Sequence, residues 1–389
     1  MAAKKSDPFS YILLSLAVLG ALVLAWTYYS NGYARDPAPL ARADTYRTVT
    51  VAEGLSFPWS LAFLPENKGF LVTERGGRLL HISPDGQTKT EMTGLPDIFV
   101  SGQAGLFDIA LSPSFAKNKQ VFLAFAEGTA EENNTALARA TLDLDKKRLK
   151  NLRIIFRATP KVKGNAHYGG RILFAPDGTL FLTLGDRFSY RDQAQTTVNH
   201  LGTIVRLLAD GGIPKDNPFT DDKHSKPEIY TFGNRNVQGI ALQPGTDKIW
   251  AHEHGPRGGD EVNILKAGAN YGWPVVTFGR EYSGLEITDK TSAPGMEDSV
   301  IHWVPSIAPS GMAFYHGDKF PEWKGDLFVG ALAGQHLRHL KVEGDKITHQ
   351  AMMLKPMEER IRDVRSGPDG YLYILTDSPD GRLIRIEPK

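Results

Sequence analysis

Glycine-rich loops hold the residues of this sequence that are best suited to chemistry. His167 lies in "GNAHYGGR", where glycines leave room for a ligand and an imidazole could act as a general base near neutral pH. Arg235 and Asn236 lie in "FGNRNVQG" and suit a planar carboxylate or carbonyl. Gln103 in "SGQAGLFD" adds a neutral hydrogen-bond donor. For each loop, a structural turn or an ion pair with a neighbouring element is the alternative.

A second group of cations follows near the C-terminal end. Arg360 and Arg362 in "EERIRDVRSGPDG" are two residues apart, so on a strand they would lie on the same face. Two neighbouring cations repel unless an anion or buried acids lie between them. Together with Arg235, they predict a site for a small polyanionic ligand.

The stretch "EHGPRGGDEVN", residues 253–263, combines backbone freedom with charge. Gly255 and Pro256 can turn carbonyl oxygens outward, and Asp260 and Glu261 add carboxylate oxygens. Oxygen donors are the preference of a hard cation such as calcium. Zinc held by His252 and His254, which would share a strand face, is the alternative, although a third zinc ligand is not evident.

The elements that must position these loops belong to a repeat. Each copy is an alternating apolar segment, a turn near Pro or Pro-Asp-Gly, and a β-rich segment. The six copies are "WSLAFLPENKGFLVTER", "FDIALSPSFAKNKQVFLAFAE", "GRILFAPDGTLFLTLGD", "QGIALQPGTDKIWAHEH", "SGMAFYHGDKFPEWKGDLFVGAL" and "IRDVRSGPDGYLYILTD". Their turns lie near residues 65, 113, 176, 244, 317 and 369, a spacing that suits four-stranded blades with insertions. Residues 46–389 are therefore predicted to form a six-bladed β-propeller rather than a two-sheet sandwich.

The N-terminus predicts a location for this domain. Lys4 and Lys5 precede an apolar run over residues 11–29, and about 20 apolar residues are needed to span a bilayer as a helix. Residues 1–34 are predicted to be a membrane anchor, with a cleaved signal peptide as the alternative. Residues 35–45 would be a linker. We expect the propeller on the periplasmic or extracytoplasmic side, held at the inner membrane by residues 11–29.

Composition excludes several classes of site. The chain has 389 residues with 45 Lys+Arg against 44 Asp+Glu, so it has no electrostatic footprint for nucleic acid. It contains no cysteine, which excludes disulfides, thiolate zinc sites and iron–sulfur clusters.

Six motifs occur in order: "HYGGR", "GGIPKDNPF", "FGNRNVQG", "EHGPRGGDEVN", "NYGWP" and "RIRDV". In this ordered set, residues 46–389 resemble the glucose/sorbosone dehydrogenase family, in its branch of aldose sugar dehydrogenases that depend on pyrroloquinoline quinone (PQQ). The resemblance implies a six-bladed propeller, PQQ and Ca²⁺ as cofactors, and oxidation of aldoses at the anomeric hydroxyl to the lactone. The electron acceptor, the preferred sugar and the oligomeric state stay open.

The resemblance also implies roles for the residues named above. His167 would be the base, while Arg235 with Asn236 would polarise the quinone carbonyl. Gln103 would contact substrate and cofactor. The tricarboxylate cofactor would be bound by Arg360 and Arg362, which would account for the cluster of cations.

Further contacts are implied for the backbone and the metal. Gly255 and Pro256 would hold one calcium through their carbonyls, and Glu261 with the Tyr271 carbonyl would hold a second. The cofactor would also meet the backbone at Ala331, Leu332 and Ala333.

This chain departs from the soluble glucose dehydrogenases of the family in two places. Ala166 stands where they carry Asp before the catalytic histidine, and "GALAG" stands where they have a loop lysine. Both departures argue against specificity for glucose. A calcium-dependent propeller hydrolase, such as a sugar lactonase, and a non-catalytic sugar-binding propeller are the alternative functions.

Overall fold

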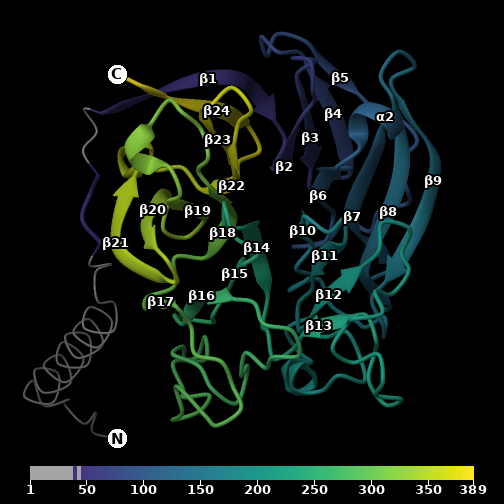
Figure 1. Ribbon diagram of the computed structural model, residues 1–389, viewed down its shortest axis with the longest axis vertical. Coiled ribbons are helices and arrows are strands. Elements are labelled where there is room, and N and C mark those ends of the chain that lie inside the picture. Colours follow the sequence, from purple (N-terminus) through teal and green to yellow (C-terminus); the bar gives the residue numbers. More distant parts are fainter. Residues whose placement is uncertain (1–37, 42–44) are drawn as a thin grey trace, which may run out of the picture. The chain divides into compact units, whose positions relative to one another are not determined.

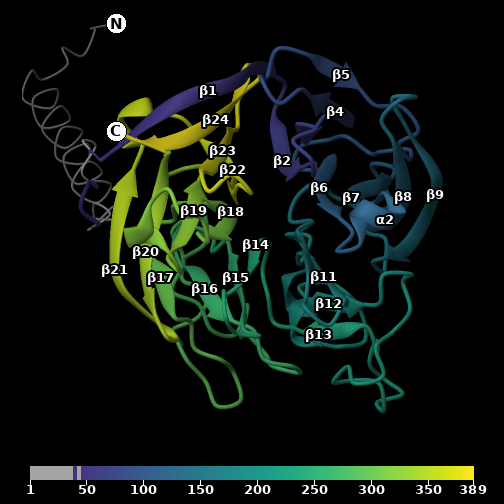
Figure 2. The same ribbon diagram turned by 45° about the horizontal axis from the view of Figure 1, so that its top comes forward.

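Six four-stranded antiparallel sheets account for nearly all of the regular secondary structure in the computed structural model, which describes residues 38–41 and 45–389. The first strand of each sheet contacts the first strands of both neighbouring sheets, and these contacts run through β2, β6, β10, β14, β18, β22 and back to β2. The sheets therefore close into a six-bladed β-propeller, seen as a ring in Figures 1 and 2. This confirms the predicted fold.

The strands of the first three sheets are β2 (Pro58–Phe63), β3 (Phe70–Glu74), β4 (Arg78–Ile82), β5 (Lys89–Glu91), β6 (Leu106–Leu111), β7 (Gln120–Gly128), β8 (Asn133–Asp143), β9 (Arg148–Arg157), β10 (Ile172–Phe174), β11 (Leu180–Thr183), β12 (Ile204–Leu207) and β13 (Ile229–Thr231). Those of the last three are β14 (Val237–Leu242), β15 (Ile249–Glu253), β16 (Asp260–Ile264), β17 (Ile301–Trp303), β18 (Pro309–Phe314), β19 (Leu327–Ala331), β20 (His336–Glu343), β21 (Lys346–Met353), β22 (Ile361–Ser366), β23 (Leu372–Thr376), β24 (Gly381–Pro388) and β1 (Tyr46–Leu55). The described helices are short: α2 (Phe115–Asn118), η1 (Arg191–Gln195), η2 (Pro321–Trp323) and η3 (Lys355–Met357).

The sequence repeat corresponds to the first hairpin of each sheet. Its turns fall between β2 and β3, β6 and β7, β10 and β11, β14 and β15, β18 and β19, and β22 and β23. In two of them, Pro-Asp-Gly places the glycine at positive φ, 84° at both Gly178 and Gly370. The loops entering β6, β10, β14 and β22 thus meet around the propeller axis.

The ring is closed by a strand from the other end of the chain. β1 pairs antiparallel with β24, from Tyr46 opposite Pro388 to Leu55 opposite Gly381. The last sheet therefore has the order β1-β24-β23-β22 and joins both ends of the domain. The repeat alone did not predict this closure.

Part of the predicted linker pairs with the propeller. The amide of Ala41 donates to the carbonyl of Met352 at 2.8 Å, and the amide of Met352 donates to Pro39 at 2.8 Å. Residues 38–41 thus extend the outer edge of the β18–β21 sheet beside β21. The predicted anchor, residues 1–34, lies outside the described residues.

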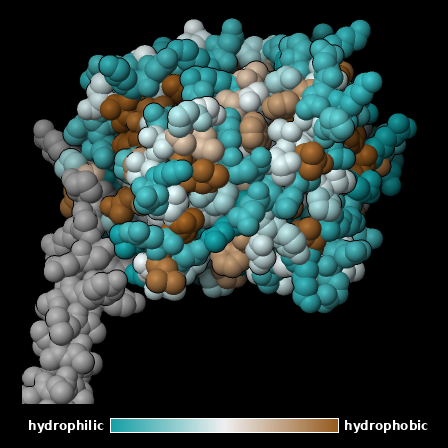
Figure 3. Space-filling view, turned by 90° about the horizontal axis from the view of Figure 1, so that it is seen from below, coloured by the Kyte–Doolittle hydropathy of each residue, from teal (hydrophilic) through white to brown (hydrophobic). Residues whose placement is uncertain are grey.

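The core lies between adjacent sheets, where both faces of each blade are apolar. Phe107, Phe122, Leu137 and Leu182, for example, pack together between the second and third sheets. Figure 3 shows hydrophilic side chains over most of one outer face of the domain, with hydrophobic ones scattered among them. The apolar surface is thus used mainly to join the blades.

Charged side chains join the inner strands around the axis. Asp363 of β22 accepts from Nη1 of Arg171 at 2.7 Å and from Nε of Arg365 at 2.9 Å. Arg365 also donates to Asp108 of β6 at 2.7 Å. Arg171 further donates to the carbonyl of Arg362 at 3.1 Å, so this buried network fixes the backbone of a predicted cofactor-binding residue.

Candidate active site

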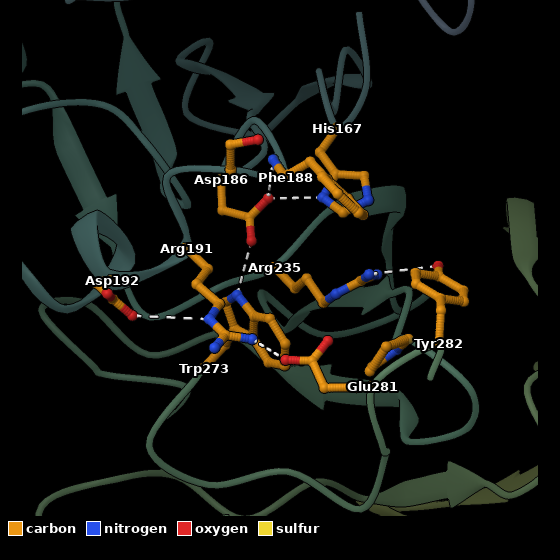
Figure 4. Close-up of a pocket in the computed structure, with 11 residues that line it drawn as sticks. His167, Asp186, Phe188, Arg191, Asp192, Arg235, Trp273, Glu281 and Tyr282 are labelled. Carbon is orange, nitrogen blue, oxygen red and sulfur yellow. Dashed lines mark hydrogen bonds and ion pairs between the residues drawn. The ribbon is translucent and has the colours of Figure 1, made fainter. Parts of the chain in front are cut away.

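His167 lies on the loop before β10 and is held by two hydrogen bonds. Its backbone is left-handed, with φ of 53°, and its amide donates to Oε1 of Gln103 at 2.8 Å. Nδ1 lies 2.6 Å from Oδ1 of Asp186, whose Oδ2 accepts from the Trp273 indole at 2.7 Å. Figure 4 shows this chain of contacts at the cavity wall. Because Asp186 engages Nδ1, Nε2 is the nitrogen that can take a proton from a bound molecule.

The electrostatics of the pair favour a neutral base beside an ionised carboxylate. Burial lowers the pKa of His167, and the charge of Arg235 lowers it further, against the opposing effect of Asp186. Burial raises the pKa of Asp186, but its hydrogen bond to His167 and the charge of Arg235 leave that pKa below its usual value. Asp186 is thus an acceptor, and His167 carries its proton on Nδ1.

Arg235 is fixed by backbone carbonyls rather than by a salt bridge. Its Nη1 donates to the carbonyls of His254 and Gly255, both at 3.0 Å, and the guanidinium lies 5.2 Å from the Trp273 ring centroid. Its backbone amide donates to the carboxylate of Glu253. Among the described residues, no hydrogen-bond partner meets its buried Nε, so a donor remains for a ligand.

A first cavity of about 260 Å³ opens beside these two residues. His167, Arg235 and Pro256 are the predicted site residues on its wall. Phe188 and Tyr282 stack across it with ring centroids 6.3 Å apart. The remaining lining residues are Asp186, Ser189, Arg191, Asp192, Trp273 and Glu281, of which Arg191 and Glu281 form an ion pair. The wall thus combines aromatic faces with polar groups, as a sugar requires.

A second cavity of about 240 Å³ brings together five predicted cofactor-binding residues: Gln103, Asn236, Leu332, Arg360 and Arg362. Its other lining residues are Trp59, Arg75, Phe107, Tyr168, Gly169, Gln238, His254 and Ala308. Ala331 is instead buried in β19, and neither it nor the exposed Ala333 lines this cavity. Only Leu332 of that loop lies where the cofactor contact was predicted.

The neighbouring arginines of the second cavity share an acid. Nη2 of Arg360 and Nη2 of Arg362 lie 3.0 and 3.2 Å from Oδ2 of Asp377. The Asp377 carboxylate offsets one of the two positive charges. Part of the repulsion between Arg360 and Arg362, from which an anionic ligand had been predicted, is therefore relieved by the protein itself. The pair still leaves a net positive charge at the wall.

A third cavity, of about 10 Å³, has room for a single water-sized species and is lined by Gly255, Glu261 and Tyr271 of the predicted metal residues, together with Glu253. Glu253 and Glu261 face each other on β15 and β16. Burial and, for Glu261, the charge of Glu253 raise the pKa of Glu253 to about 7 and that of Glu261 to about 8. Two facing carboxylates suit a hard cation.

The two predicted calcium sites differ in how well their donor atoms are placed for a metal ion. Glu253, Glu261 and Tyr271 surround one cavity, whereas Pro256 lines the first cavity and the Gly255 carbonyl accepts from Arg235. In the described part of the chain, no group of three or more His, Asp or Glu side chains is arranged to hold a metal ion. The donor set near Glu261 therefore fits a cation better than the predicted site at Gly255 and Pro256.

Asp260 and His254 shape the loop "EHGPRGGDEVN" from within. Asp260, which had been expected to supply a metal ligand, accepts from the amides of Gly255, Ile307 and Ala308 at 2.9, 2.7 and 3.1 Å. Nε2 of His254 lies 2.6 Å from the Pro309 carbonyl of the next sheet. Asp260 is thus structural, whereas His254 is held by the next sheet and also lines the second cavity.

Asp186, Trp273, Glu253 and Asp377 were missed at the sequence level. Asp186 closes the third repeat copy, "GRILFAPDGTLFLTLGD", where it looks like an ordinary strand end. Its position three residues after the buried strand β11, at the end that carries the His167 loop, was the available signal. Asp377 likewise ends its copy of the repeat and directly follows β23 in the last sheet.

Comparisons with known proteins agree with this arrangement. The sequence model of the Glucose / Sorbosone dehydrogenase family matches residues 55–385. The chain is 42% identical over 352 residues to aldose sugar dehydrogenase YliI of Escherichia coli, covering 90% of this chain and 95% of that protein.

Solved structures are similar as well. The apo-form crystal structure of the soluble aldose sugar dehydrogenase from Escherichia coli has a TM-score of 0.86 and 42% identity, covering 89% of this chain and 100% of that one. The PQQ-bound aldose sugar dehydrogenase from Streptomyces coelicolor has a TM-score of 0.73 and 29% identity, covering 90% and 100%. These relatives support an oxidoreductase that acts on sugars.

Proposed function

The chain belongs to the glucose/sorbosone dehydrogenase family, and from this premise we propose that it oxidises aldose sugars at the anomeric hydroxyl, using pyrroloquinoline quinone and calcium. The product would be the lactone, and the electrons would pass to an external acceptor. The observation that carries the proposal is the His167–Asp186 pair beside an arginine-lined cavity. The PQQ-bound relative supports the choice of cofactor.

The residues of the second cavity fit an anionic planar cofactor. Arg360 and Arg362 would bind carboxylates, with Gln103, Asn236 and the Leu332 region on the other walls. Arg235, which had been predicted to bind the cofactor, does not line this second cavity; its unsatisfied Nε is a donor beside the first cavity. When bound, the quinone would accept the hydride from the sugar.

The protein's own part in the reaction is to hold and move a proton. Nε2 of His167 would accept the proton of the anomeric hydroxyl, and Asp186 would stabilise the resulting imidazolium through Nδ1–H. Arg235 would stabilise the negative charge that develops on the acceptor side. Phe188 and Tyr282 would orient the sugar ring in the first cavity.

Calcium would be held by Glu253, Glu261 and the carbonyl of Tyr271, where the donor set fits it. For the location, we propose the periplasmic or extracytoplasmic side, with residues 11–29 as an inner-membrane anchor. Among residues 38–41 and 45–389, no helix is long and apolar enough to cross a membrane.

The test is reconstitution of purified protein with PQQ and Ca²⁺, followed by dye reduction with a panel of aldoses. We expect the dye to be reduced only when the sugar, the quinone and calcium are all present. Failure to bind quinone, or no dye reduction with any aldose, would overturn the proposal. Lactone hydrolysis without quinone would instead identify a propeller hydrolase.

A further inference from the structure

Arg75 is a third guanidinium on the wall of the second cavity, beside Arg360 and Arg362. It follows β3 in the first sheet, whereas the other two come from the last sheet. Its backbone is fixed on both sides: its amide donates to the Phe57 carbonyl at 3.0 Å, and its carbonyl accepts from Leu106 at 3.1 Å. Its position is therefore set by the inner parts of two blades.

Packing rather than a salt bridge holds the side chain. A Cβ added at Gly105 would lie 2.8 Å from Cγ of Arg75 and 2.0 Å from the Arg75 carbonyl oxygen. The backbone and the first part of the Arg75 side chain therefore pack directly against Gly105. The guanidinium lies 4.6 Å from the ring centroid of Phe57. A contact with a ring face leaves the in-plane N–H donors available.

The charge around this cavity is unbalanced. Its lining includes three arginines and no carboxylate. Asp377 pairs with Arg360 and Arg362, and the charge of Arg75 also helps to lower the pKa of Asp377. Arg75 itself makes no ion pair within residues 38–41 and 45–389, so one carboxylate faces three guanidiniums. His254, the remaining titratable wall residue besides Tyr168, is held neutral because burial lowers its pKa well below the usual value. The wall therefore favours a ligand with at least two negative charges.

We infer that Arg75 binds a carboxylate of the anionic cofactor, one that the Arg360–Arg362 pair does not take. The inference rests on the proposed function and adds a binding residue to it. Because guanidinium and carboxylate match as a two-pronged pair, a preformed Arg75 on the neighbouring sheet would give the cofactor a second point of attachment and so help to fix its orientation.

The test measures binding rather than turnover. Titration of PQQ into calcium-loaded protein, followed by tryptophan fluorescence or calorimetry, gives the dissociation constant. Arg75→Gln is expected to weaken PQQ binding by about 10- to 100-fold, the loss typical of one charged hydrogen-bonded contact. Arg75→Lys, which keeps the charge but not the planar fork, should lose less. Arg153→Gln, an exposed site on β9 with the same change in charge, is the matched control.

A second ligand separates charge from packing. The trimethyl ester of PQQ lacks carboxylate charges and cannot form the ion pair that Arg75→Gln removes. Wild type and Arg75→Gln should therefore bind the ester with dissociation constants within about twofold of each other. Equal binding of PQQ by wild type and Arg75→Gln would overturn the inference, as would an equal loss for PQQ and its ester. Absence of PQQ binding by the wild type would show instead that the proposed function has failed.

Discussion

His167 and Asp186 form one functional group made from two loops of the third sheet. Asp186 fixes the tautomer and direction of the imidazole, and Trp273 and the Phe188 amide in turn fix Asp186. His167 was found from the sequence because glycines surround it. Asp186 was not, because its contact with His167 is made in space, 19 residues along the chain.

Asp186→Asn is expected to lower kcat by about 10²- to 10⁴-fold, because the amide can present its NH₂ to Nδ1 and favour the wrong tautomer. The quinone affinity should stay within a few-fold, since Asp186 does not line the second cavity. Steady-state dye reduction and a binding titration check both. A loss of less than threefold in kcat would show that the pair has no role in proton transfer.

The pH dependence follows from the lowered pKa of His167. The base must be neutral to accept a proton, and a lowered pKa keeps it neutral to more acidic pH. We therefore expect the acid limb of kcat/KM to lie below pH 6.5, the ordinary value for histidine. A profile measured from pH 4.5 to 8.5 tests this, and an acid limb above 6.5 would contradict it.

At the scale of elements, each blade contributes one loop to the axis, and the charged network of inner strands sets how these loops meet. The hairpins were predictable because Pro-Asp-Gly turns depend on local backbone preferences. The partners of the charges were not, since Asp363 meets Arg171 across the ring, 192 residues apart. Asp260 was misassigned for the same reason: its amide partners at residues 307 and 308 lie in another sheet's loop.

Asp363→Asn is expected to destabilise the fold by about 3–5 kcal/mol, because it removes one carboxylate from the buried Arg171 and the partly buried Arg365. Urea unfolding followed by intrinsic fluorescence measures the loss. Asp145→Asn, in an exposed turn, is the control and should change stability by less than about 0.5 kcal/mol. Equal stability of both variants would mean that the network is dispensable.

Glu253 and Glu261, on neighbouring strands, predict that calcium stabilises the protein. At saturating Ca²⁺, about 100 times the dissociation constant, the free energy of unfolding should rise by about 2.7 kcal/mol. Chelation of Ca²⁺ should remove this increase, and Glu261→Gln should abolish most of it. The calcium-free variant should be at least as stable as the calcium-free wild type, because the substitution removes a charge that repels Glu253. Thermal unfolding with and without Ca²⁺ compares the variant with Glu53→Gln, an exposed control. A full calcium response in Glu261→Gln would refute this site.

At the scale of the whole molecule, the fold depends on one long-range pairing, that of β1 with β24. The sequence repeat predicted the number of blades, since every blade buries the same apolar faces. It could not show which end of the chain supplies the last outer strand, because β1 carries no turn motif.

Truncation separates the parts of the N-terminus. Removal of residues 1–37 should leave a folded propeller, because the described domain begins at residue 38. Removal through Leu55 should give aggregated or unfolded protein, because β24 loses its outer partner β1 and exposes an open edge, although it still pairs with β23. Circular dichroism and size-exclusion chromatography distinguish the two. A well-folded monomer without β1 would contradict the closure.

The pairing of residues 38–41 with Met352 places two hydrogen bonds between the N-terminal side of the chain and β1. Any tension that reaches the domain from its N-terminal side must pass through these residues before it reaches Tyr46. Two backbone hydrogen bonds, from Ala41 to Met352 and from Met352 to Pro39, would bear that load first. Because they belong to β21 and not to the β1–β24 pair, they can break while the pairing that closes the ring stays intact.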